Sequence, residues 1–426
     1  GLSGAPEELI FHLGGKKEAP RVKLLASLKG LTFEHPSLKS AFELESGQLD
    51  FQYGSHLNWE KLEIALGKLK LYSHGRYKGS FDAGEFVQSH LSSSLHLGEI
   101  LRLLSLEKSI VSNARARLEG ELSGSLFAPV VSGIVSAPGN FHVKAIGADR
   151  PFRVDLGDLE ANWLFDGVEG FLRVQDLRGK LAQGDLKGDL DLGFMASPPI
   201  HRGEVELQGM NLDSFLRRGA NLGGLMRGEL DLGFRGELSK GLGSLVGKGE
   251  LKIRRSFLNG SKLIRVAGFD RFLPSRDKRH RDLGGLLLQR ATEGLLNRSN
   301  EGKTLLRVRD VLHHDFEFGE IAAKLNASEG LFLIEDIASK GGSSSLNGAI
   351  GVELEALLLD GSASFRLTRE PDILIIREIQ LGGSISEPSF KLPRGPMQTF
   401  ELRSMTKEVE QEPPEPGDSD SVIMER

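Results

Sequence analysis

Apolar and polar residues alternate along most of this chain, in short stretches that stop at a glycine or a polar turn. In residues 250–253 and 364–367, for example, every second side chain is apolar. A period of two is typical of β-strands that bury one face and expose the other. Turn dipeptides such as Asp360-Gly361 favour tight hairpins. The pattern therefore predicts a meander of antiparallel strands.

Repeated segments and a few helical patterns extend this prediction. A shift of 40 residues aligns residues 187–194 (KGDLDLGF) with residues 227–234 (RGELDLGF), and the apolar and glycine positions coincide. Such recurrence predicts an array of similar sheet units. Short helices that flank the sheet are expected at residues 97–106, 212–218 and 283–297, where the apolar spacing is helical.

The chain divides into three regions on these signals. Residues 1–240 are expected to form an upstream segment of repeated sheet, and residues 241–400 a C-terminal β segment that contains the helix near 283–297. Residues 401–426 are acidic, rich in proline and nearly free of aromatic side chains, so we expect a disordered tail. The sequence leaves open whether the two β segments form one continuous groove or two units.

Composition and charge narrow the classes of protein that fit. Glycine stands at 53 of 426 positions while hydrophobic residues still make up 39%, so the chain is apolar enough to fold and its glycines serve turns. The absence of cysteine excludes disulfides, thiol nucleophiles and cysteine-based zinc sites. The formal net charge of −5 argues against a nucleic-acid binder. No run of residues approaches the ~20 apolar positions of a spanning helix.

A long sheet with one apolar face must cover that face, and the predicted helices are too few to do so. Three solutions remain: the sheet closes into a barrel, it packs on itself as a sandwich or solenoid, or it curls into an open trough that a lipid fills. The aromatic residues are 23 Phe against 2 Trp and 3 Tyr. Phe with Leu, Val and Ile makes an apolar lining without hydrogen-bonding groups, which disfavours a carbohydrate site.

Strand-like segments broken by glycines recur in the second half of the chain. They are residues 246–260 (VGKGELKIRRSFLNG), 318–333 (FGEIAAKLNASEGLFL), 343–367 (SSSLNGAIGVELEALLLDGSASFRL) and 381–393 (LGGSISEPSFKLP), and residues 122–133 (LSGSLFAPVVSG) are a weaker example. These segments resemble the AsmA-like proteins and their TamB relatives, large β-rich proteins of the bacterial envelope. The resemblance is strongest over residues 245–393, and it is a pattern of strands and glycines that contains no chemical signature.

The resemblance implies an elongated groove that carries phospholipid between inner and outer membranes. It implies a periplasmic location in a diderm bacterium, with a tether to the inner membrane in a segment outside this chain. Expected partners are phospholipid or another acyl lipid, components of both membranes and proteins at the groove ends, with no nucleic acid, metal or other cofactor. The expected fold is mainly β: a twisted antiparallel sheet curled into an open hydrophobic groove, with a few short flanking helices.

The alternation gives the positions expected to line the groove. The structural alternative is that the same side chains fill a closed core. These positions are Val205, Leu207, Leu230, Leu232, Phe234, Leu251, Ile253, Phe332, Ile334, Phe365, Leu367, Ile373 and Ile375.

Few motifs offer other chemistry. His313-His314-Asp315 lacks a clustered third ligand when read as a strand, and residues 241–247 miss the spacing of a dinucleotide-binding loop, so neither is expected to bind a metal or a nucleotide. A basic stretch could contact lipid headgroups at a membrane surface, although a solvated loop is the simpler interpretation. Its cations are Arg271, Arg276, Lys278, Arg279 and Arg281.

The sequence therefore favours a non-enzymatic protein that shields acyl chains in a β-groove. One rival is a structural scaffold whose sheets cover themselves and whose exposed edges bind partners. A second rival is a β-rich enzyme that acts on a surface glycan, which would need converging carboxylates.

Overall fold

The computed structural model describes most of the chain. The residues outside this description are 1, 4–7, 17–18, 28–30, 34–41, 53–55, 67–68, 80–83, 99–109, 113, 126–127, 146–151, 194–199, 240, 268–297, 392–395 and 405–426.

Strands dominate the described part of the chain. They are β1 (Leu2–Ser3), β2 (Glu8–Lys16), β3 (Ala19–Ser27), β4 (Leu31–Phe33), β5 (Phe42–Gln52), β6 (His56–Leu66), β7 (Leu69–Lys78), β8 (Glu85–His96), β9 (Ile110–Ser112), β10 (Arg115–Gly124), β11 (Pro129–Ala145), β12 (Phe152–Asp166), β13 (Phe171–Leu181), β14 (Gly184–Gly193), β15 (Ile200–Asn211), β16 (Met226–Leu238), β17 (Val246–Asn259), β18 (Asp315–Ser328), β19 (Leu331–Gly341), β20 (Ser345–Glu353), β21 (Leu358–Arg369), β22 (Asp372–Gly383), β23 (Pro388–Lys391) and β24 (Phe400–Ser404).

These strands form one antiparallel meander. From β10 to β22 each strand pairs with the next along the chain, and β8, β7, β6 and β5 continue the sheet beyond β10. Within the described residues, β2 at one end and β23 and β24 at the other each pair on one side only, so the sheet is open. The predicted fold class, a mainly antiparallel β-sheet with few helices, is confirmed.

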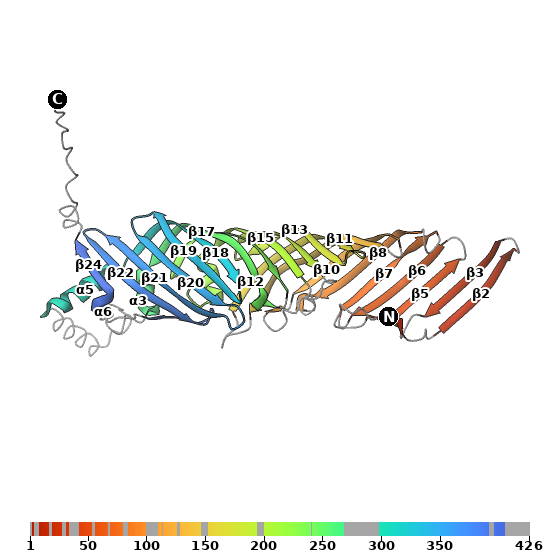
Figure 1. The fold of residues 1–426 in the computed structure, drawn as a ribbon, viewed down its shortest axis with the longest axis horizontal. Coiled ribbons are helices and arrows are strands. Elements are labelled where there is room, and N and C mark those ends of the chain that lie inside the picture. Colours follow the sequence, from red (N-terminus) through yellow and green to blue (C-terminus); the bar gives the residue numbers. More distant parts are fainter. Residues whose placement is uncertain are drawn as a thin grey trace, which may run out of the picture.

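The sheet is long, and its strands cross the long axis obliquely (Figure 1). Strands β2 and β3 lie at one end, and α5 and β24 lie at the other. Towards this second end the sheet curls, so that side chains of β16 to β18 and of β21 and β22 join one hydrophobic cluster. The pairing of β16 with β17 spans residue 240, so the sheet is continuous across the expected division at 240/241.

Bulges repeat along the meander. Asp158, Asp176, Arg255 and Asp336 each have a φ angle near +50°, and each lies at a shift in strand register. A bulge inserts an extra residue on one strand and increases the local right-handed twist. Repeated bulges therefore help the sheet to twist and curl along its length.

The described helices are short. They are α2 (Leu212–Gly219), α3 (Gly260–Val266), α5 (Asn300–Leu312), α6 (Pro396–Thr399) and the 3₁₀ turn η1 (Leu242–Ser244). Helix α2 confirms the expectation at 212–218, and the Asn211 side chain caps it by accepting a hydrogen bond from the Ser214 N–H. Helices α3 and α5 were not predicted. Among the described residues, no helix has both the length and the apolar composition needed to cross a membrane.

The tail expected at residues 401–426 and two of the expected helices agree with the described structure only in part or lie outside it. Residues 401–404 belong to β24, which pairs with β22, so the tail prediction is wrong for these four residues. The apolar alternation of Phe400 and Leu402 places both against the main hydrophobic cluster, and this outweighs the acidic composition that follows. Residues 405–426 and the helix expected at 283–297 lie outside the described residues, as does most of the helix expected at 97–106.

Candidate functional site: the apolar inner face

We define the inner face as the side of the sheet that carries Leu207, Leu230 and Ile253, three members of the main hydrophobic cluster. Residues directly opposite each other on antiparallel strands share a face. Leu207 lies opposite Leu232, and Leu230 lies opposite Ile253. Val205 lies opposite Phe234 by the same register. The predicted lining positions of β15, β16 and β17, including Leu251 opposite Leu232, therefore share one face.

The same face continues through β18 to β21. Leu251 lies opposite Ala323 of β18, and the alternation of β18 then places Leu325 and Ala327 on the inner face. Ile334 lies opposite Leu325, and Phe332 lies opposite Ala327. On β21, Phe365 and Leu367 lie opposite the core residues Ile376 and Leu374. These predicted positions are thus brought together.

Ile373 and Ile375 lie on the other face of β22. Ile373 is opposite Arg403, and Ile375 is opposite Glu401. The inner positions of this strand are instead Leu374 and Ile376, both 0% exposed. The run Ile-Leu-Ile-Ile is apolar on both faces, so its own alternation does not tell which face turns inward. Leu367 of β21 lies opposite Leu374, and this register places Leu374 and Ile376 on the inner face.

The inner face has a tightly covered part, which we call the capped end. It lies beside α3 and α5, where Val308 and Leu312 of α5 are fully buried. Its other members are Leu258, Phe316, Phe318, Leu367, Leu374 and Ile376, each no more than 4% exposed. This density of contact is that of an ordinary protein core, which has no room for a ligand.

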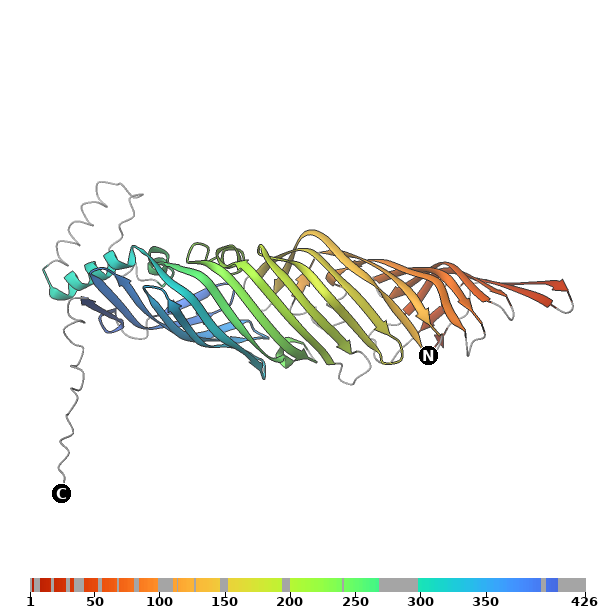
Figure 2. The same ribbon diagram turned by 90° about the horizontal axis from the view of Figure 1, so that it is seen from above.

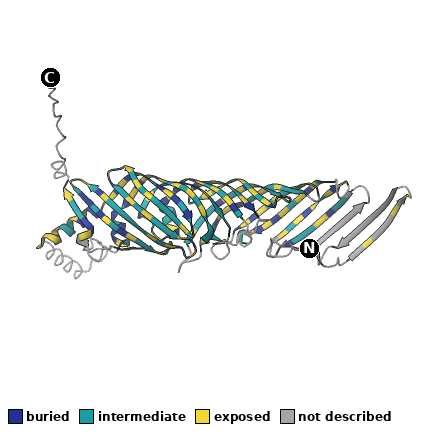
Figure 3. Ribbon diagram, in the orientation of Figure 1, coloured by how far each residue is buried: buried dark blue, intermediate teal, exposed yellow. Residues whose placement is uncertain are grey.

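Away from the helices the inner face is only half covered, and we call this part the open stretch. Along β16, Leu230 is buried, whereas Leu232 and Phe234 are half-buried. Figure 3 shows buried, half-buried and exposed positions mixed along the strands of the sheet. Along β21, Leu367 is buried, whereas Phe365 and Leu359 are half-buried. The open stretch comprises Leu172, Val174, Leu177, Leu186, Leu190, Val205, Leu232, Phe234, Phe332, Ile334, Leu359 and Phe365.

Aromatic rings fill the inner face where glycines leave the backbone bare. A Cβ atom at Gly247 would lie 2.5 Å from Cζ of Phe234, and one at Gly120 would lie 2.6 Å from Cζ2 of Trp163. Phe234 also contacts Phe332, with ring centroids 5.5 Å apart. The rings thus occupy the space that other side chains would take. Phenylalanines and glycines at paired strand positions are the sequence feature that could have predicted this packing.

The outer face carries charges in ion pairs. Arg254 Nε lies 2.8 Å from an Asp231 carboxylate oxygen, and Lys324 Nζ lies 2.8 Å from Asp336 Oδ2. The hydrogen bond to Asp231 raises the pKa of Arg254, and the hydrogen bond to Asp336 raises the pKa of Lys324. The arrangement is that of a solvated charged surface.

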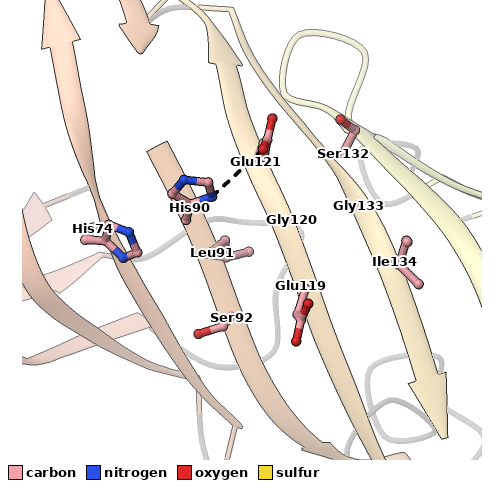
Figure 4. Close-up of a pocket in the computed structure, with 10 residues that line it drawn as sticks. All are labelled: His74, His90, Leu91, Ser92, Glu119, Gly120, Glu121, Ser132, Gly133 and Ile134. Atoms are coloured by element: carbon pink, nitrogen blue, oxygen red, sulfur yellow. Dashed lines mark ion pairs between the residues drawn. The ribbon is translucent and has the colours of Figure 1, made fainter. Parts of the chain in front are cut away.

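The outer face also has two shallow hollows. One, of about 520 Å³, is lined by His74, His90 and Glu121 among others (Figure 4). The two imidazole centroids are 5.0 Å apart, and His90 Nδ1 lies 3.9 Å from Glu121 Oε1. Among the described residues, no group of three or more His, Cys, Asp or Glu side chains is arranged to hold a metal ion. The second hollow lies over the ion pair of Arg202 with Glu237.

The remaining predicted motifs are placed as follows. His313 follows the last residue of α5 instead of lying on a strand, and its Nδ1 is 3.1 Å from Ser261 Oγ. Asp315 begins β18 and forms an ion pair with Arg227. The predicted headgroup contacts Arg271, Arg276, Lys278, Arg279 and Arg281 lie outside the described residues.

Similarity to known proteins adds no constraint to this site. Comparison of the chain with protein-family models, with curated proteins and with solved structures found no match.

Proposed function

We propose that this chain is a non-enzymatic lipid-binding protein that shields phospholipid acyl chains on its inner face and helps to move lipids between inner and outer membranes. The observation that carries the proposal is the open stretch. There the apolar side chains of consecutive strands share one face and are only half-buried, although the capped end of the same sheet is buried. A continuous apolar face that its own protein covers only in part favours an apolar partner.

The energetics of burial fit an acyl chain. A chain of ~16 carbons gains roughly 13 kcal/mol when it leaves water, at ~0.8 kcal/mol per methylene. The same acyl chain gains a similar free energy when it enters a bilayer. Transfer between a bilayer and the open stretch is therefore close to isoenergetic, and a protein of this kind needs no tight site for a headgroup.

The length of the sheet fits a conduit better than a single pocket. The consecutive strands from β6 to β22 span about 70 Å at ~4.8 Å per strand. The residue resemblance to AsmA-like and TamB-related proteins supports a location in the periplasm of a diderm bacterium, with an inner-membrane tether in a segment outside this chain.

Native mass spectrometry of the purified chain, with extraction and identification of bound lipid, tests this function. We expect several phospholipids per chain, and fewer in Leu232→Asp and Val205→Asp, which place a charge on the open stretch. Glu206→Lys, on the outer face of β15, is the matched control and should keep its lipid. Circular dichroism would verify that each variant retains the sheet.

A lipid-free, stable monomer would contradict the proposal. It would favour a scaffold that binds partners through its sheet edges, because β2 and β24 each pair on one side only within the described residues. Equal loss of lipid from Leu232→Asp and Glu206→Lys would also contradict the groove.

A further inference from the structure

Exposed apolar side chains gather along one long side of the sheet, which we call the hairpin rim. It consists of the described connections at residues 167–170, 239, 241–245, 329–330 and 354–357 and the strand ends beside them. Nine large hydrophobic residues are exposed in the described part of the chain, and five of them lie at this rim. They are Val168 (64% exposed), Val246 (56%), Leu331 (45%), Leu358 (45%) and Phe171 (39%).

Four of these five residues occupy equivalent positions. Phe171, Val246, Leu331 and Leu358 are the first residues of β13, β17, β19 and β21. Each points to the outer face, because the residue that follows it lies on the inner face. Apolar residues scattered singly on a surface need no explanation, but a row that recurs at the start of four strands is not scattered.

The opposite long side of the sheet differs in charge and polarity. It carries α2, α3 and α5, and Figure 2 shows the green and teal helices on the side away from the green η1 turn of the hairpin rim. Arg265 of α3 and Lys303 of α5 are exposed there, and no described acid forms an ion pair with them. An anionic surface would therefore meet this helical side more favourably.

The hairpin rim is acidic beside Leu331 and Leu358. Leu331 and Leu358 both lie opposite Glu353 in the strand register. Glu353 is exposed, as are Glu329 and Glu355 in the adjoining turns, and no described cation forms an ion pair with any of the three. Carboxylates beside apolar side chains complement a surface that presents ammonium groups above an apolar layer.

We propose that the hairpin rim docks on the surface of a zwitterionic phospholipid bilayer. The apolar row enters the interface, and the glutamates face the ammonium groups of the lipid headgroups. The rim is also the place where lipid passes between bilayer and groove, a step that rests on the function proposed above. Leu331 on the outer face is followed by Phe332 on the inner face, and Leu358 is followed by Leu359, so an acyl chain meets apolar side chains on both sides of the rim.

Binding to vesicles tests this surface. The full chain would be floated with vesicles of phosphatidylethanolamine and phosphatidylcholine, alone and with added phosphatidylglycerol. We expect binding to the zwitterionic vesicles, no gain from the anionic lipid, and roughly tenfold weaker partition of the triple variant Val246→Ser, Leu331→Ser and Leu358→Ser, since each change removes an apolar side chain from the interface. The control Tyr72→Ser and Ile134→Ser removes two exposed apolar side chains elsewhere on the outer face and should bind as the unaltered chain does.

Three outcomes would overturn the inference: no binding of the unaltered chain, equal loss in the control, or binding that requires phosphatidylglycerol. Analytical ultracentrifugation tests a fourth outcome. If the unaltered chain self-associates and the triple variant does not, the apolar row is a protein–protein surface. If the triple variant loses the sheet by circular dichroism, Val246→Ser and Leu358→Ser carry the test singly.

The lipid content measured by native mass spectrometry separates this inference from the proposed function. Bound lipid without vesicle binding would refute the docking rim and leave the groove standing. Vesicle binding by a chain that holds no lipid would refute the groove and leave the docking rim standing.

Discussion

Leu367 and Leu359 lie on the inner face of one strand, β21, yet Leu367 is fully buried and Leu359 is only half-buried. The strand pattern is the same at both positions, and the neighbours differ. At the capped end, helix α5 and the side chains of β18 and β22 close over the apolar face. In the open stretch the covering is partial: Phe365 contacts Phe318 of the capped end, with ring centroids 6.3 Å apart, yet it stays half-buried. An alternating strand thus supplies an apolar face, and other elements decide how far that face is covered.

The largest difference between the two regions should appear on truncation of a core phenylalanine. Phe318 is 0% exposed and belongs to the main cluster, so Phe318→Ala should lower the free energy of unfolding by about 3–5 kcal/mol. Urea denaturation followed by circular dichroism would measure it. A loss below about 1 kcal/mol would mean that the capped end is loosely packed.

The matching change in the open stretch should cost less stability and more lipid. Leu190 is half-exposed already, so Leu190→Ala should lower the unfolding free energy by about 1 kcal/mol in lipid-free protein. Its effect on bound lipid, measured by native mass spectrometry, should exceed that of Phe318→Ala. The reverse order would place the lipid site at the capped end.

The helices that make the capped end depend on their caps. The Asn259 side chain accepts a hydrogen bond from the Lys262 N–H at the start of α3. Asn259→Ala should therefore cost about 1 kcal/mol. Hydrogen exchange should report the loss mainly in α3 and in the adjoining part of α5. Equal deprotection of β13 and β14 would argue that the helices do not act locally.

The smallest expected effect is a pH dependence at the last strand. Hydrogen bonds from Arg377 and Arg403 lower the pKa of Glu401, which lies on β24. A depressed folded-state pKa means that the contribution to stability is present above the unfolded-state value and is lost as the pH falls through the folded-state value. The urea concentration at the unfolding midpoint of the native chain should thus decrease as the pH is lowered below about 4. In Glu401→Gln this decrease should be smaller. An unchanged pH profile would show that the ion pairs at β24 are screened by solvent.

Local patterns predicted the elements whose periodicity is clear within a short stretch of sequence. The alternation at 250–253 and 364–367 predicted β17 and β21, and the helical spacing at 212–218 predicted α2. Helix α5 was missed even though Ser299 caps it by accepting a hydrogen bond from the Gly302 N–H. The buried Arg309 interrupts its apolar spacing.

The faces of ambiguous strands needed long-range pairing. Ile373 and Ile375 alternate as well as Leu374 and Ile376 do, and only the register with β21 and β24 turns the second pair inward. The same holds for residues 401–404, whose pairing with β22 gives them a place in the sheet that their composition does not predict.

The sequence by itself determined the period of two, the antiparallel meander and the apolar character of one face. These are local properties, because successive side chains of a strand point to opposite sides and short turns such as Glu329-Gly330 join neighbouring strands. The expected turn at Asp360-Gly361 is wrong, since both residues lie within β21. Only the tertiary structure decided how far each part of that face is covered. Coverage depends on contacts between strands and helices far apart along the chain, such as Leu312 of α5 and Ile376 of β22 in one cluster, and no short window of sequence encodes them.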